Sequence, residues 1–367
     1  MTLNKKLGLI AGVVTIMACA VWGGILYIAM QAPVDLVTTD KTSTTETSTT
    51  VVTDQNQPSD ELVARRIDGV LVPTDQANLW PLGIMIENAA FGGVRPQSGL
   101  SFAQVVYEVP VEAGITRFIA FFSGDLPDAL GPVRSARPTF LEFNSEYDGL
   151  FAHAGGSPEA MQAVDGLSVR DLSALGAEAK YFYRNSTLVA PHNLFTSGTL
   201  LTQARQDKGL AQSLPIYESW LFKDDTPVAQ PSLAPLSIDF GSGPLYAVDY
   251  TYNPTTNSYD RKNGGDPQTD AITGQVISPK VVIVQMVPPG VLTGTEGRIN
   301  YAVTGNGTAY IAQDGAVIAG QWSKTDRQSR TIYRDATGNK LSLNRGAIWI
   351  SIVPTTGKVI LPNIGTN

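Results

Sequence analysis

Three short apolar runs in the first half of the chain decide the fold: LGIMIE at 82–87, VVYEVPV at 105–111 and FIAFF at 118–122. Each is rich in β-branched or aromatic residues and short enough for a buried strand. Two helix starts follow. SPE at 157–159 places a capping serine, a proline and a glutamate before an apolar run, and Ser197 precedes another run that ends near Gly209. This alternation predicts an α/β (or α+β) domain over residues 65–214.

The second half has a different pattern. Residues 215–244 carry five prolines, which predicts a junction between domains. Beyond it, residues 246–252 alternate between apolar and polar side chains, as a half-buried strand does. Further strand-like runs lie at 281–287, 299–303, 309–312, 317–322, 331–334 and 347–353, with turn signals at 306–307, 314–315 and 337–338. We therefore predict a mainly antiparallel β domain over residues 245–367.

Residues 7–30 (LGLIAGVVTIMACAVWGGILYIAM) contain no charge. As a helix they are long enough to cross a hydrocarbon core of about 30 Å. Lys5 and Lys6 precede the run and acidic residues follow it, so the positive-inside rule places the N-terminus in the cytoplasm. This predicts a single-pass membrane anchor within residues 1–32, with the folded part outside the cytoplasm.

Two alternatives to this anchor stay open. A cleaved signal peptide would need a small-residue cleavage site, for which Ala32 is the nearest candidate. A lipid could instead be attached at Cys19 in IMAC (16–19), although an apolar stretch follows that cysteine. Residues 33–64 are rich in threonine and serine, so we predict a disordered tether there.

Composition excludes several classes of function. The 367 residues carry 26 basic and 33 acidic side chains, a formal net charge of −7. Without a basic block, the chain is a poor candidate for binding nucleic acid. One cysteine excludes an intramolecular disulfide and a multi-cysteine metal site, and two histidines leave little for a histidine-rich metal centre.

Arginine is the candidate ligand-binding residue. Every basic residue between Arg66 and Lys180 is an arginine, and four of these lie in or beside glycine-rich segments: Arg95, Arg117, Arg134 and Arg137. A guanidinium group meets two carboxylate or phosphate oxygens at once, and exposed backbone amides add donors. If the four groups converge, they form an anion pocket. Alternatively, they make structural ion pairs with Glu108, Glu112, Glu142 and Glu146.

Both histidines are candidates for acid–base chemistry. His153 ends an apolar run before a Gly-Gly turn into a helix, where open α/β sheets place ligands. His192 lies in a loop beside Pro191. Together with Glu108 or Asp148 they could form a general acid–base set or part of a metal site, or each could be a hydrogen-bonded structural histidine. Ser135 lacks the G-x-S-x-G context of a hydrolase nucleophile.

Several blocks together resemble the YerB-like family, a two-domain bacterial family of unknown function whose members are usually described as lipoproteins. The blocks include PLGIMIEN (81–88), VRPQSGL (94–100), GPVRSARP (131–138), AHAGGSPEA (152–160) and PHNLFTS (191–197). The resemblance covers nearly all of the predicted folded part and implies an N-terminal and a C-terminal domain. It implies no activity.

A weaker likeness is to the LytR–CpsA–Psr phosphotransferases, which transfer glycopolymers from a lipid pyrophosphate to the cell wall. It rests on the order of elements and on residue type: membrane helix, early strand with an acidic end, threonine-led strand, arginine segment and Gly-Gly turn. It implies a phosphotransferase in which arginines stabilise the pyrophosphate and Glu87 or Glu108 holds Mg²⁺ or acts as base.

Three functions therefore stay open for a cell-envelope protein. It could bind an anionic cell-wall polymer or a lipid-linked phosphate, with no cofactor. It could be the phosphotransferase, with Mg²⁺ as cofactor. It could be a scaffold for other envelope proteins. The sequence names no protein partner and does not decide whether a reaction is catalysed.

Overall fold

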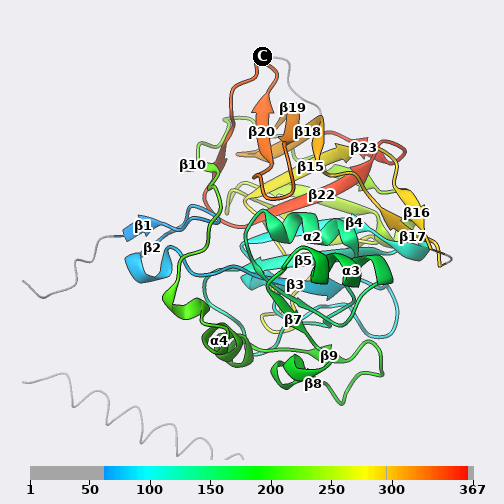
Figure 1. The fold of residues 1–367 in the computed structure, drawn as a ribbon. Helices are drawn as coiled ribbons and strands as arrows, with labels where there is room; N and C mark the ends of the chain where they lie inside the picture. Colours follow the sequence, from blue (N-terminus) through cyan, green and yellow to red (C-terminus); the bar gives the residue numbers. More distant parts are fainter. Residues whose placement is uncertain (1–61, 295, 363–367) are drawn as a thin grey trace, which may run out of the picture. The chain divides into compact units, whose positions relative to one another are not determined.

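The structure is a computed structural model that describes residues 62–294 and 296–362. A ten-stranded mixed sheet forms its centre (Figure 1). Five strands come from the first half: β3 (Leu82–Glu87), β4 (Val105–Pro110), β5 (Thr116–Phe122), β6 (Leu150–His153) and β7 (Asp171–Ser173). Five come from the second: β15 (Val281–Val287), β18 (Gly305–Gln313), β19 (Ala316–Lys324), β20 (Ile332–Asp335) and β22 (Ile348–Pro354). Their order is β20-β19-β18-β15-β22-β4-β5-β3-β6-β7.

The two halves of the chain meet inside this sheet. β22 pairs in parallel with β15 on one side and with β4 on the other. All seven residues of β22 are buried, as expected for a strand covered on both faces. The other pairings of the second half in this sheet are antiparallel, as predicted, and β22 is the exception because both of its neighbours, β15 and β4, run parallel to it.

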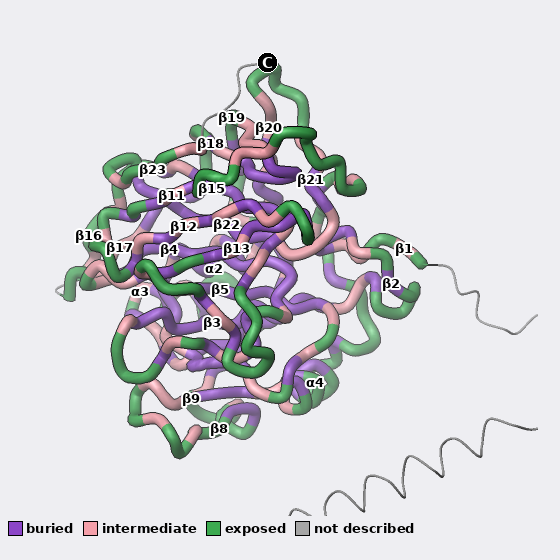
Figure 2. Tube along the Cα trace, turned by 180° about the vertical axis from the view of Figure 1, so that it is seen from behind, coloured by how far each residue is buried: buried purple, intermediate pink, exposed green. Residues whose placement is uncertain are grey.

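A smaller antiparallel sheet lies behind the large one in the view of Figure 1 and on the near side in Figure 2. It contains β11 (Leu236–Asp239), β12 (Val248–Asn253), β13 (Ser258–Asn263), β14 (Asp266–Pro267) and β23 (Lys358–Ile360). The remaining strands form two-stranded pairs. These are β1 (Leu62–Ala64) with β2 (Leu71–Pro73), β8 (Tyr183–Arg184) with β9 (Leu194–Phe195), β10 (Leu221–Lys223) with β21 (Ser342–Asn344), and β16 (Val291–Thr293) with β17 (Arg298–Asn300).

Three α-helices complete the described part of the chain: α2 (Pro138–Ser145), α3 (Pro158–Gly166) and α4 (Gly198–Asp207). Ser157 and Ser197 cap α3 and α4 by accepting from Ala160 N at 3.2 Å and Leu200 N at 3.3 Å, which confirms both predicted starts. α2 and α3 cover one face of the large sheet, whereas α4 and the small sheet cover the other.

The core follows the alternation of each strand. On β3, Ile84 and Ile86 pack toward the small sheet and α4, while Met85 packs toward α2 and α3. The result is a three-layer arrangement that buries apolar side chains on both faces of the large sheet.

An α/β first half followed by a strand-rich second half is confirmed. The boundaries at 65–214, 215–244 and 245–367 stay predictions, and the predicted junction contains β10 and β11. The predicted anchor at 7–30, Cys19 and the tether up to residue 61 lie outside the described residues. Among residues 62–294 and 296–362, no helix is both long and apolar enough to span a membrane.

Candidate functional site

The candidate site lies where two parallel strands separate. β3 and β6 pair from Leu82–Leu150 to Ile84–Ala152, and beyond that point the segment 132–136 lies between them. Arg134 N donates to Met85 O at 2.9 Å, and Arg134 O accepts from Ala154 N at 3.1 Å. This insertion carries Arg134 and Arg137 to the carboxyl ends of the strands, where open α/β sheets bind ligands.

Glu87, the last residue of β3, joins Arg134 to His192. Its two carboxylate oxygens each lie 3.0 Å from His192 Nδ1, and Oε1 lies 3.2 Å from Arg134 Nε. Because Nδ1 faces a carboxylate, it carries the hydrogen and leaves Nε2 for another partner. Gly92, with φ +71°, covers the imidazole closely: a Cβ there would lie 2.8 Å from His192 Cδ2.

Arg134 is the arginine of this cluster with free donors. Its side chain is 25% exposed, against 5% for Glu87. Its ion pair with Glu87 uses Nε, and its two terminal nitrogens make no hydrogen bond within the described part of the chain. The two terminal nitrogens of the guanidinium group therefore stay available to donate to an oxyanion.

Glu112 holds the other two arginines. Arg137 donates to it through Nε, at 2.9 Å, and through Nη2, while Arg117 donates through Nη2 at 3.2 Å. Burial alone would raise the pKa of Glu112, but the hydrogen bonds from Arg137 and the charge of Arg117 lower it to about 2. Burial, and then the charge of Arg137, lower the pKa of Arg117 to about 10. Arg117 and Arg137 therefore make structural ion pairs, which is the second of the two alternatives that the sequence left open.

The charges of this cluster do not cancel. Three guanidinium groups face two carboxylates, those of Glu87 and Glu112. Guanidinium groups therefore outnumber the carboxylates that pair with them in this cluster. An anion is the ligand that such a site stabilises.

Arg95 is not part of this cluster, so the expectation that four guanidinium groups converge is wrong. It donates through Nε and Nη2 to Asn88 Oδ1 and Asn88 O, and through Nη1 to Leu245 O, each at 2.9 Å. It also stacks 5.1 Å from the Tyr246 ring centroid. These contacts place it in the wall of a separate cavity of about 330 Å³ between the two halves of the chain.

Glu108 is fully buried and cannot act as a base for an external ligand. Its carboxylate accepts from Arg261 Nη2 at 2.5 Å, Thr116 Oγ1 at 2.8 Å and Trp349 Nε1 at 3.3 Å. Both of its oxygens are therefore used inside the core, where they tie β4 to β13 and β22.

His153 is also satisfied internally. Its ring is buried, with Nδ1 2.7 Å from Gly155 O and Nε2 2.6 Å from Asp171 Oδ1. Neither nitrogen is left for a ligand, so the structural alternative describes His153. Of the two histidines, only His192 keeps a free ring nitrogen.

No magnesium site follows from these carboxylates. The partners of Glu87 are His192 and Arg134, and that of Glu108 is Arg261, so a divalent cation at either would meet positive charge. In residues 62–294 and 296–362, no group of three or more histidine, cysteine, aspartate or glutamate residues could hold a metal ion.

The Glu87–His192 contact and the role of Glu112 were not predicted as parts of one site. Glu87 and His192 are 105 positions apart, and no local pattern links them. One signal was available: on neighbouring antiparallel strands Glu87 lies opposite Arg117, a pairing that the acidic end of one run and the basic start of another suggest.

Comparison with known proteins identifies the family. The model of the "Protein of unknown function (DUF3048) N-terminal domain" matches residues 69–211, and that of its C-terminal domain matches residues 236–350. "Putative lipoprotein YerB" of Bacillus subtilis (strain 168) is 28% identical over 275 residues, which cover 75% of this chain and 81% of that protein.

A solved structure agrees with the sequence match. The crystal structure of the YerB protein from Bacillus subtilis superimposes with a TM-score of 0.71 at 27% identity, and the match covers 81% of this chain and 99% of that one. The chain belongs to this YerB-like family, with its DUF3048 N-terminal and C-terminal domains, which confirms the resemblance seen in the sequence.

Proposed function

We propose that this protein is an extracytoplasmic component of the cell envelope that binds an anionic group, a phosphate or a carboxylate, at Arg134. The observation that carries the proposal is the guanidinium group of Arg134, which is fixed by Glu87 and still has two free terminal nitrogens. His192 is held by the same carboxylate through Nδ1, and its Nε2 has no partner among the described residues. Arg117 and Arg137 add positive charge without contacting the ligand.

The location rests on two arguments. A relative is named a lipoprotein, and residues 7–30 of this chain are apolar enough to anchor it. A reporter enzyme fused after Asn367 should therefore be active outside the cytoplasm, whereas activity inside would contradict the orientation. Replacing Cys19 with alanine separates the two modes of attachment, because only a lipidated protein would lose its membrane association.

Binding to the folded protein is tested with three anions. Thermal unfolding is followed with inorganic phosphate, pyrophosphate and a polyprenyl phosphate, because a ligand that binds only the folded state raises the melting temperature. Arg134→Gln should reduce the shift without loss of fold. Arg334→Gln, which changes the same charge on distant β20, is the matched control and should keep it. A shift as large in Arg134→Gln as in the unchanged protein would disprove the proposal.

The Glu87–His192 pair supports phosphotransfer as a second candidate function. A carboxylate on Nδ1 orients an imidazole whose Nε2 can take or give a proton, as in general acid–base catalysis. If the protein transfers phosphoryl or glycopolymer groups, His192→Gln should abolish turnover and leave phosphate binding at Arg134 within a few fold. Binding without turnover would favour the binding protein.

A further inference from the structure

A larger cavity lies at the other end of α2. It has a volume of about 920 Å³, within the range of small-molecule sites, and segments from both halves of the chain line it. Residues 215–218 form one wall and residues 325–332 another, while Ser145, the last residue of α2, lies at its edge. The Arg134 site adjoins the first turn of α2, because Arg137 directly precedes the helix.

Arg330, one of the residues that line this cavity, is a buried cation without a hydrogen-bond partner. Its side chain has no exposed surface, and none of its three nitrogen atoms makes a hydrogen bond. Glu146 Oε2 lies 3.9 Å from Nη1, too far for a hydrogen bond. The Glu146 carboxylate is already engaged by Thr331 N at 3.1 Å, Thr331 Oγ1 at 2.7 Å and Lys324 Nζ at 3.2 Å.

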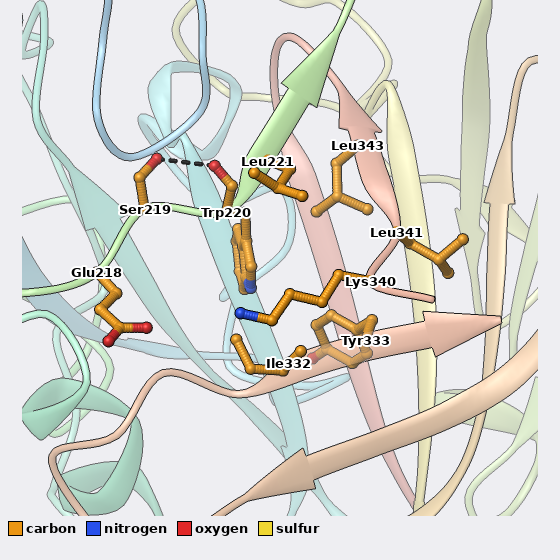
Figure 3. Close-up of a pocket in the computed structure, with 9 residues that line it drawn as sticks. All are labelled: Glu218, Ser219, Trp220, Leu221, Ile332, Tyr333, Lys340, Leu341 and Leu343. Atoms are coloured by element: carbon orange, nitrogen blue, oxygen red, sulfur yellow. Dashed lines mark hydrogen bonds between the residues drawn. The ribbon is translucent and has the colours of Figure 1, made fainter. Parts of the chain in front are cut away.

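Aromatic rings occupy both faces of this guanidinium group. Its Cζ lies 3.7 Å from the ring centroid of Trp220 and 3.9 Å from that of Tyr147. Trp220 Nε1 donates to Thr331 O at 2.8 Å, which fixes the indole. On the neighbouring side, Trp220 lines a small pocket of about 60 Å³ together with Lys340 and Tyr333 (Figure 3), a space too small for a second ligand.

This stacking leaves the donors of Arg330 unused. The N–H bonds of a guanidinium group lie in its plane, so rings on its two faces do not accept from them. Five buried donors without acceptors are strongly unfavourable. A carboxylate or phosphate matches them two at a time and would neutralise the charge as well.

A second unpartnered donor lies beside Arg330. The Tyr217 hydroxyl is buried without a hydrogen-bond partner, and the Tyr217 ring centroid lies 5.9 Å from Arg330 Cζ and 5.4 Å from Arg66 Cζ. Burial raises the pKa of Tyr217 to about 12, so the hydroxyl keeps its proton. Arg66, Tyr217 and Arg330 all line the cavity.

Most of the acidic residues that line the cavity already have partners of their own and so do not neutralise its arginines. Asp148 pairs with Arg170 at 3.1 Å. Asp326 accepts from the backbone amides of residues 328 and 329, at 2.9 and 2.8 Å. Among the acidic residues that line the cavity, this leaves Glu218 to face the two arginines.

We propose that this cavity is a second oxyanion site, in which a carboxylate or phosphate group binds Tyr217 and, after a local shift of the side chains that cover it, Arg330, while Arg66 contributes charge at the rim. The volume exceeds that of a bare phosphate, so the anionic group belongs to a larger polar molecule. The site is distinct from the Arg134 site, since the two lie at opposite ends of α2.

The test uses isothermal titration of the folded protein with inorganic phosphate and acetate. Tyr217→Phe removes only the hydroxyl and keeps the ring, so the fold should persist while affinity at this site falls about tenfold, as expected for a lost hydrogen bond to a charged group. Tyr310→Phe on β18 is the matched control and should bind normally. Glucose 1-phosphate and glucuronate then distinguish a phosphate from a carboxylate as the natural group.

Single variants test the two sites independently. Arg134→Gln should leave binding at the Tyr217 site unchanged, and Tyr217→Phe should leave the Arg134 site unchanged. If Tyr217→Phe binds every probe as the unchanged protein does, or if Arg134→Gln removes all binding, the second site does not exist. Failure of Arg134→Gln to alter any binding would instead contradict the proposed function and leave this inference intact.

Discussion

Arg134 and Arg137 differ by only three positions, yet the structure gives them opposite roles, and this can be measured. Arg137 is almost buried and makes two charged hydrogen bonds to Glu112 and one, at 2.7 Å, to Ala136 O. Arg134 is partly exposed and makes one ion pair without a hydrogen bond. We expect Arg137→Ala to reduce stability strongly and Arg134→Ala to reduce it little.

The magnitudes follow from these contacts. A hydrogen bond to a charged group contributes about 1.5–3 kcal/mol. Glu112 keeps Arg117 and some contact with water, so we expect Arg137→Ala to lower the free energy of unfolding by about 3 kcal/mol. Arg134→Ala should cost about 0.5 kcal/mol, as a partly exposed ion pair does. With an unfolding entropy of about 2.1 cal/mol/K per residue over roughly 300 residues, these values correspond to about 5 °C and about 1 °C in melting temperature.

The assay is thermal and urea unfolding of both single variants, each with and without inorganic phosphate. Arg137→Ala should unfold earlier yet retain the full shift with phosphate, whereas Arg134→Ala should unfold normally and show a smaller shift. Equal destabilisation by the two changes would refute the assigned roles. So would a phosphate shift that depends on Arg137 rather than on Arg134.

Three further predictions concern stability. The pKa of Glu112 falls from 4.5 to about 2 on folding, so its ionised form stabilises the fold by about 2 kcal/mol after allowance for solvent. This contribution is complete above pH 4.5 and is lost as the pH falls toward 2. In Glu112→Gln, the free energy of unfolding measured in urea should therefore depend less on pH over this range. Arg261→Met should cost about 3–5 kcal/mol by leaving Glu108 unpaired, and adding Glu108→Gln should recover part of that loss in urea unfolding. Ser157→Ala should remove the α3 cap and cost about 1 kcal/mol by the same measurement, with unaltered stability as the contrary result.

Most strands could be predicted because their apolar runs are short and end at turn residues. α2 could not. Its N-cap is Arg137, which makes no capping bond, and its eight residues PTFLEFNS contain two aromatics near a leucine, a pattern shared with strands. The turn predicted at Asn306 and Gly307 is wrong, since both lie within β18. Gly307 serves packing instead: a Cβ there would lie 2.6 Å from Trp322 Nε1.

The local sequence pattern could not predict that β22 pairs in parallel with both of its neighbours. Its sequence, IWISIVP, indicates a strand buried on both faces, but not which strands flank it. Its partner β4 is about 240 positions earlier. The candidate site shows the same limit. Arginine content indicated an anion site, but only the placement of residues 132–136 between β3 and β6 separates Arg134 from the arginines whose donors Glu112 consumes.

Helix α2 explains why both candidate sites depend on the whole fold. Its residues Thr139, Glu142 and Glu146, counting the position just after its end, recur at i, i+3 and i+7 and so share one face. Each contacts the second half of the chain: Thr139 through Tyr301 N at 3.0 Å, Glu142 through Arg327 Nη2 at 2.6 Å, and Glu146 through the Lys324 and Arg330 side chains. The second half thereby fixes α2, which begins directly after Arg137 and ends at the edge of the cavity that Arg330 lines. This half also supplies β22, the neighbour of β4. We therefore expect the first half alone to lose the geometry of the Arg134 site, although it contains all of the residues of that site.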